Sequence, residues 1–134
     1  MKAGTIKYEA TGDLLISFQT AGPIPEPMWA DFIKCLNTPA IRKYVATTIG
    51  AVEANSVQRK LATDVFKARK IPVVVVTESG LVRGLATAAS WLGADVKSCD
   101  WPEVRKGLEH LGVTGTQQER AVVIIQQLKA NYAR

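Results

Sequence analysis

Asn55 and Ser56 are the residues of this chain whose types and spacing most readily suggest chemistry. They follow a β-prone run at residues 44–50 and open an amphipathic run at residues 55–70, so the sequence predicts a strand, a loop and a helix. A hydroxyl at the start of such a helix lies beside backbone N–H groups that can receive or bind an anion. Because Asn55 and Gln58 also form a capping-box pattern, the pair predicts an anion site, a helix cap, or both.

A second polar segment follows the next predicted strand. Thr77 and Ser79 come after the apolar run at residues 73–76, and Ser79 is a normal N-cap for a helix at residues 80–92. Because the carboxyl ends of parallel strands share one edge of a sheet, we expect the two polar segments at the same edge. The candidates for binding a partner or an anion there are Glu53, Asn55, Gln58, Arg59, Thr77, Ser79 and Arg83.

Other catalytic or metal-binding patterns are weak in this sequence. The single histidine, His110, has no neighbouring serine or cysteine to activate. Cys35 and Cys99 lack CxxC spacing, which fits reduced thiols better than a disulfide or a zinc site. Neither GxGxxG nor GxxxxGK[ST] is present. We therefore expect a non-enzymatic protein with no catalytic residues, no cofactor and no metal.

The composition predicts one globular domain over residues 1–134. Hydrophobic residues make up 47% of the 134 residues and charged residues 22%. No apolar run approaches the roughly 18 to 20 residues of a membrane span, and no apolar segment for secretion follows Met1, so we expect a cytoplasmic protein. The net charge of +5 comes from dispersed basic residues, which favours a solvated surface over a nucleic-acid site.

The order of predicted elements indicates an α/β fold. Two β-prone runs at residues 5–10 and 14–20, separated by Thr11-Gly12-Asp13, predict an N-terminal hairpin. Strands and helices then alternate, which demands right-handed crossovers and a mostly parallel sheet with helices packed on it. The remaining predictions are strands at residues 44–50, 73–76 and 95–98, and helices at residues 26–37, 55–70, 80–92, 101–111 and 117–132.

Two of these helices carry further predictions about their faces. In the helix at residues 55–70, the predicted core face consists of Val57, Leu61 and Val65 with Ala62 and Phe66 beside them, and Gln58 belongs to the polar side. Thr116 with Glu119 forms a capping-box pattern for the last helix. The apolar run at residues 122–125 exceeds one buried stripe, which favours either a homodimer contact or the shielding of a sheet edge. The candidate contact residues are Val122 and Ile125.

The element order, together with Asn55-Ser56 at the start of a helix, resembles the STAS family of anti-sigma factor antagonists over roughly residues 6–113. In that family an Asp-Ser pair opens the corresponding helix, and a partner kinase that doubles as an anti-sigma factor phosphorylates the serine. The resemblance implies a STAS-like α/β sandwich in which Ser56 matches the phosphoacceptor and Asn55 stands where the aspartate would be. The helix at residues 117–132 is an addition to the minimal family domain.

These observations predict a signalling or interaction module that docks a protein partner through the surface around Ser56. The resemblance implies a partner of the kinase or anti-sigma factor type, with phosphorylation of Ser56 as the switch. One alternative is a small-molecule or nucleotide binder that uses the helix N-termini as an anion site. Another is a structural subunit that associates through residues 122–125.

Overall fold

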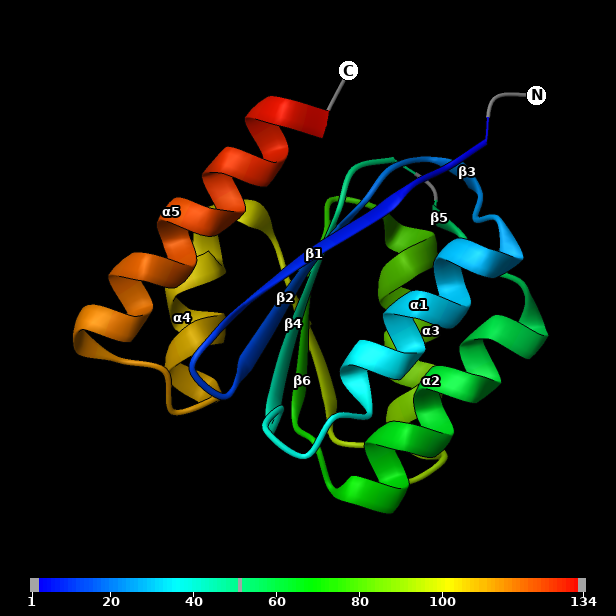
Figure 1. The fold of residues 1–134 in the computed structure, drawn as a ribbon, viewed down its shortest axis with the longest axis horizontal. Helices are drawn as coiled ribbons and strands as arrows, with labels where there is room; N and C mark the ends of the chain where they lie inside the picture. Colours follow the sequence, from blue (N-terminus) through cyan, green and yellow to red (C-terminus); the bar gives the residue numbers. More distant parts are fainter. Residues whose placement is uncertain (1–2, 51, 133–134) are drawn as a thin grey trace.

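A computed structural model of the protein describes residues 3–50 and 52–132. A mixed sheet of five strands lies in the middle, with helices on both faces (Figure 1), which confirms the predicted α/β fold. The strands of this sheet are β1 (Ile6–Thr11), β2 (Leu14–Gln19), β4 (Lys43–Thr48), β6 (Val73–Val76) and β7 (Val96–Cys99). The helices are α1 (Glu26–Leu36), α2 (Ser56–Arg69), α3 (Gly80–Trp91), α4 (Val104–His110) and α5 (Gly115–Tyr132), with a 3-10 turn η1 (Trp101–Glu103) before α4.

The N-terminal hairpin forms as predicted. Thr11 pairs with Leu14, so Gly12 and Asp13 make a two-residue turn between β1 and β2. The φ angle of Gly12 is +61°, and a glycine with positive φ at the first turn position is typical of a type II′ hairpin turn. β2 then pairs in parallel with β4, which leaves β1 as the antiparallel strand at one edge.

The parallel strands lie side by side in chain order, β2, β4, β6 and β7. The helices α1, α2 and α3 connect successive strands, and right-handed crossovers that advance in one direction place their helices on the same face. Figure 1 shows these three helices on one side of the sheet and α4 and α5 on the other. The strand order of this sheet never reverses, so it has no switch point at which a doubly wound fold opens a ligand crevice.

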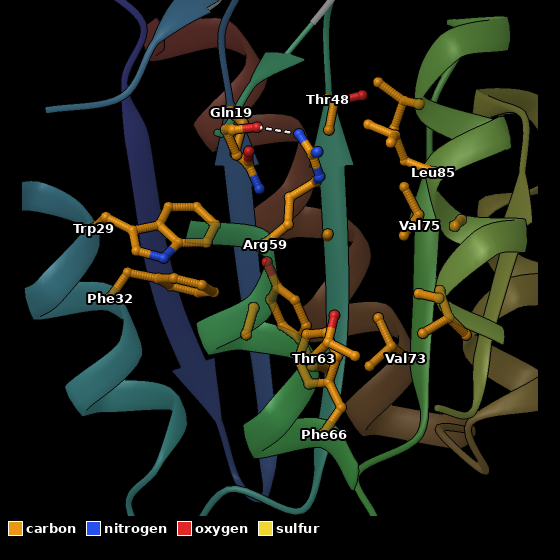
Figure 2. A pocket seen from close by; sticks show the side chains of 18 residues that line it. Gln19, Trp29, Phe32, Thr48, Arg59, Thr63, Phe66, Val73, Val75 and Leu85 are labelled. Carbon is orange, nitrogen blue, oxygen red and sulfur yellow. Dashed lines mark hydrogen bonds between the residues drawn. The ribbon is translucent and has the colours of Figure 1, made fainter. Parts of the chain in front are cut away.

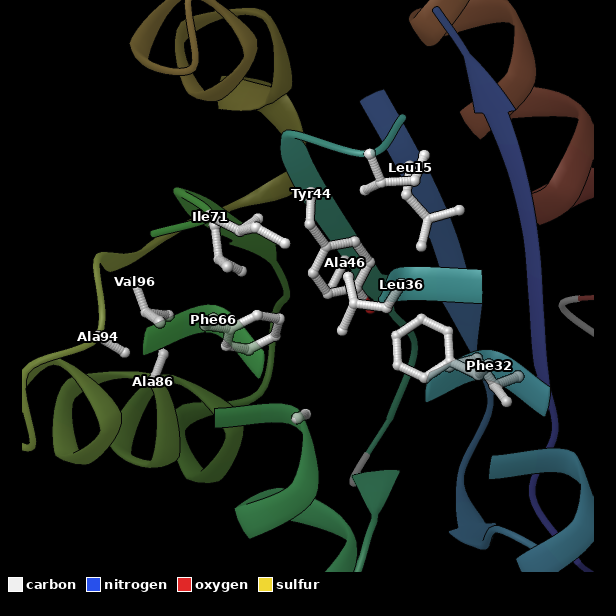
Figure 3. Close-up of a cluster of buried hydrophobic side chains, with 14 of the residues drawn as sticks. Leu15, Phe32, Leu36, Tyr44, Ala46, Phe66, Ile71, Ala86, Ala94 and Val96 are labelled. Atoms are coloured by element: carbon white, nitrogen blue, oxygen red, sulfur yellow. The ribbon is translucent and has the colours of Figure 1, made fainter. Parts of the chain in front are cut away.

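Both faces of the sheet are buried, because successive side chains of each strand point to opposite helix layers. Leu15 and Tyr44 face α1, α2 and α3, where the Tyr44 ring lies 5.7 Å from the ring of Phe66 (Figure 3). Leu14 and Val45 face α4 and α5. This burial explains why the central strands read as nearly continuous apolar runs.

The buried face of α2 differs from the predicted one. Val57 is 65% exposed and Leu61 is 46% exposed, whereas Gln58 is 1% exposed. Ala62 and Phe66 are buried and Val65 is partly buried, as predicted, so the inward face is shifted toward Gln58 and away from Val57 and Leu61. Gln58 tolerates burial because its Nε2 donates to the Ile24 carbonyl at 2.9 Å and its Oε1 accepts from the Asn55 N–H at 3.0 Å.

α5 also departs from its prediction. It begins at Gly115, so the predicted capping pair of Thr116 and Glu119 lies inside the helix. Val122 and Ile125 are buried in the cluster between α5 and the sheet, and this corrects the expectation that they form a contact between copies. The apolar run of α5 instead covers the face of the hairpin β1–β2 (Figure 1).

A short parallel ladder of two strands was not predicted. It joins β3 (Gly22–Pro23) to β5 (Val52–Glu53). Strands of two residues are too short to show a period of two in the sequence. The ladder ties the segment after β2 to the segment that leads into α2, so it positions the start of that helix.

Candidate functional site

A reciprocal side-chain cap closes the N-terminus of α2. Asn55 Oδ1 accepts a hydrogen bond from the Gln58 N–H at 2.8 Å, and Gln58 Oε1 accepts from the Asn55 N–H at 3.0 Å. Asn55 Nδ2 also donates to Glu26 Oε1 of α1 at 3.3 Å. The predicted capping box is therefore present, and it accounts for both Asn55 and Gln58 without a ligand.

Ser56 is the first residue of α2, and its side chain is exposed. Asn55 and Gln58 make the capping bonds beside it, and no hydrogen bond within residues 3–50 and 52–132 uses the Ser56 hydroxyl. The hydroxyl is thus accessible to a modifying enzyme. A phosphate added there would lie at a helix N-terminus, where the helix dipole favours negative charge.

Two large apolar side chains of the first turns of α2 are also exposed. Val57 and Leu61 are separated by one helical turn, so they occupy the same exposed face of α2. We call the surface formed by Ser56, Val57 and Leu61 the α2 entry surface. It combines a free hydroxyl with apolar area that nothing within the chain covers in the described residues.

The polar residues after β6 are engaged in internal bonds. Thr77 is buried, and its Oγ1 accepts from Thr48 Oγ1 at 2.8 Å and from the Ser79 N–H at 3.0 Å. Ser79 Oγ accepts from the Val82 N–H at 3.3 Å, so Ser79 is the predicted N-cap of α3. Burial removes Thr77, as it removes Gln58, from the candidates for direct partner or anion contact.

Arg83 faces a carboxylate. Its Nη2 lies 3.6 Å from Asp100 Oδ2 and donates to the Thr77 carbonyl at 3.2 Å, while its buried Nε has no partner among the described residues. Burial, with the nearby carboxylates of Glu103 and Asp100, raises the pKa of the Cys99 thiol, and Arg83 opposes this rise. A protonated thiol is a poor nucleophile, so this cluster holds no activated cysteine.

The remaining candidates are Glu53 and Arg59. Glu53 belongs to β5, and its side chain lies outside the part of the chain that the structure describes. Arg59 is exposed, and its Nη1 donates to the Ala54 carbonyl at 2.6 Å. The structure therefore separates the other six predicted residues into helix caps, buried polar residues, an ion pair and an accessible guanidinium.

A pocket that sequence reasoning missed lies between the sheet and the helices α1, α2 and α3 (Figure 2). Its volume is about 150 Å³, and it is partly open to solvent. Most of its lining is apolar, with Gln19 and Arg59 among the polar exceptions. The sequence signal that could have indicated it is the set of small residues on facing elements, Ala46, Ala62 and Ala86.

Comparison with known proteins adds no family to this geometry. No family model matches the chain, and no curated protein matches it. None of the described helices combines the length and apolar composition needed to cross a bilayer. The resemblance to the STAS family stays a prediction.

Proposed function

We propose that this protein is a non-enzymatic signalling or interaction module that docks a partner protein through the α2 entry surface. Phosphorylation of Ser56 switches that docking. The observation that carries the proposal is the unbonded, exposed Ser56 hydroxyl beside the exposed side chains of Val57 and Leu61. A partner can bury the apolar pair and contact the hydroxyl at the same time.

The physical basis of the switch is the charge of a phosphate. Phosphorylation adds about −1.5 to −2 charge and three acceptor oxygens at this position. The charge disfavours burial of Val57 and Leu61 against an apolar or acidic partner surface. Arg59 lies three residues after Ser56, so the new phosphate also competes for its guanidinium.

The partner follows from the resemblance, and the compartment from the thiols. The STAS-like order of elements suggests a kinase or anti-sigma factor type of regulator as the partner. Cys35 and Cys99 are both free, and burial raises the pKa of the Cys35 thiol. Free thiols fit the cytoplasm, where we place the protein.

The test combines mass spectrometry with partner capture. Protein from its native cells should carry phosphate on Ser56. Full-length wild type, Ser56→Ala and Ser56→Asp should then capture the partner unequally, with Ser56→Asp differing from Ser56→Ala by about tenfold or more because of the added charge. Leu61→Gln should weaken capture by the unmodified protein.

Ser90 supplies the matched control, because it is an exposed serine of α3 outside the α2 entry surface. Ser90→Asp should capture the partner as wild type does. Equal capture by wild type and both Ser56 variants would remove Ser56 from the mechanism. Unchanged capture by Leu61→Gln would remove the apolar pair.

The alternative of an anion held by the two helix N-termini has less support. Asn55 and Ser79 already accept the Gln58 and Val82 amides that such an anion would use. Arg83, the cation nearest the second N-terminus in the sequence, lies against Asp100. Docking of a protein therefore explains the exposed features better than a nucleotide does.

A further inference from the structure

We propose that the pocket between α2, α3 and the sheet binds a small carboxylic acid whose apolar body is about the size of a six-membered ring. The inference rests on the lining of the pocket. It does not depend on docking at the α2 entry surface, because none of Ser56, Val57 and Leu61 lines the pocket.

The space for the apolar body comes from small side chains. Ala46 on β4 faces Ala62 of α2 and Ala86 and Ala89 of α3 across the pocket. Larger side chains at these positions would fill the gap between the layers. A cavity of about 150 Å³, the volume found here, is large enough to hold benzene when its walls are apolar.

Most of the polar groups gather at one end of the pocket, and Thr63 lies toward the other end. Figure 2 shows Gln19, Thr48 and Arg59 at the end where β2 and β4 terminate, and Phe66 and Val73 toward the opposite end. A ligand that matches this distribution has one polar head and one apolar body. Sugars and nucleotides do not match, because their many polar groups would lose hydrogen bonds against the apolar walls.

Gln19 is a buried polar side chain with bonding capacity to spare. It is 7% exposed, and within the described residues its amide interacts with the Tyr44 hydroxyl, which also bonds Ser17 Oγ. A primary amide has two N–H donors and an oxygen that accepts two hydrogen bonds. Even with one of these groups directed at the Tyr44 hydroxyl, the amide keeps donors or acceptors for a ligand head.

Arg59 determines the charge of the ligand. Its Nη1 bonds the Ala54 carbonyl at 2.6 Å, and no carboxylate among the described side chains lies within 4.0 Å of the guanidinium. The other N–H groups of a guanidinium suit the planar, two-oxygen geometry of a carboxylate. The head is therefore a carboxylate, held by Arg59 with Gln19 beside it.

The test titrates benzoate and hexanoate into the full chain. Binding is followed by amide NMR shifts and by calorimetry, with benzyl alcohol and hexanol as uncharged probes of the same body. We expect shifts at Gln19, Ala46 and Ala86, and affinities for the acids at least about tenfold higher than for the alcohols, because the hydrogen bonds to the head are charge-assisted.

Substitutions separate the two parts of the site. Arg59→Gln should lower the affinity for benzoate by about tenfold or more and remove its advantage over benzyl alcohol. Lys60→Gln is the matched control, because Lys60 pairs with Asp64 at 2.7 Å and does not line the pocket. Ala86→Leu should abolish benzoate binding by filling the pocket. If Ala86→Leu fails to fold, Ala89→Leu fills the pocket from a half-buried position and should also abolish binding.

Three results would overturn the proposal. The first is the absence of shifts in the pocket with either acid at about 10 mM. The second is benzoate binding that Arg59→Gln leaves unchanged, which would rule out the carboxylate contact. The third is binding that persists in a folded, pocket-filled variant, which would place the ligand elsewhere. Leu61→Gln should weaken partner capture and leave acid binding in place, because Leu61 does not line the pocket, so failure of either proposal can be told from failure of the other.

Discussion

Asn55 and Ser56 are neighbours in the chain, yet their side chains have different environments. Asn55 is bonded on both sides of its amide, to the Gln58 N–H and to Glu26. Ser56 points to solvent, and the hydrogen bonds of the described residues do not include its hydroxyl. The fold depends on the first side chain, and the second is free for another use.

This difference predicts unequal costs of substitution. Asn55→Ala removes an N-cap, so it should lower the free energy of unfolding by about 1 kcal/mol. Ser56→Ala removes an exposed and unbonded hydroxyl, and its effect should stay within about 0.5 kcal/mol. Urea denaturation of the two variants and wild type measures both changes. Equal losses in the two variants would contradict the assignment of the cap to Asn55.

Tyr44 gives a prediction at alkaline pH. Burial raises the pKa of Tyr44 above its ordinary value of 10.0, while hydrogen bonds with Ser17 and Gln19 act in the opposite direction. As the pH rises, the Tyr44 phenol therefore loses its proton in the unfolded chain before it does in the folded protein. The stability that the protonated phenol contributes is fully present below about pH 10 and is lost as the pH rises further. The free energy of unfolding between about pH 8 and pH 11 should fall more steeply for wild type than for Tyr44→Phe. If the free energy of unfolding fell with pH equally in wild type and Tyr44→Phe, the loss would not come from Tyr44.

Among the elements, α2 shows what periodicity can predict. The spacing of apolar residues placed this helix correctly, and Ser56–Arg69 lies within the predicted range. The predicted face was right for Ala62 and Phe66 but wrong for Gln58, which is held by the Ile24 carbonyl, a partner 34 positions away in the chain. A distant backbone acceptor decided which face turned inward, and no local pattern reveals such a partner.

α5 provides the corresponding test of burial. Ile125 is buried against the sheet, whereas Val123 on the same helix is exposed. Ile125→Ala should therefore lower the free energy of unfolding by about 2 to 5 kcal/mol, and Val123→Ala should stay within about 0.5 kcal/mol. Urea denaturation at several protein concentrations checks both values. A large, concentration-dependent loss in Val123→Ala would instead indicate contact between copies.

Local signals predicted most elements, and tertiary contacts decided the rest. The Asn55–Gln58 capping box and the Ser79 cap were both predictable because each capping residue lies within four residues of its partner. The start of α5 was not, because Glu119 of the supposed capping box pairs with Arg105 of α4 instead. The pocket was also unpredictable in detail, since its walls come from elements whose distances only the fold sets.

For the molecule as a whole, the order of the strands in the main sheet decides where a ligand can fit. All crossovers of the main sheet advance the same way, so the sheet has no switch point at which a ligand crevice opens. The space lies instead between the sheet and its helices. The proposed docking surface and the proposed acid site thus lie on separate parts of the molecule.

The packing of α5 on the hairpin also has a consequence for synthesis. Gln117 Nε2 of α5 donates to the Thr11 carbonyl at 3.1 Å, across 106 positions of the chain. Each β-α-β unit can pack on the previous one as the chain leaves the ribosome, but the hairpin face that carries Leu14, Ile16 and Phe18 has to wait for α5. That face stays exposed to water and to chaperones during translation, and its burial completes the structure.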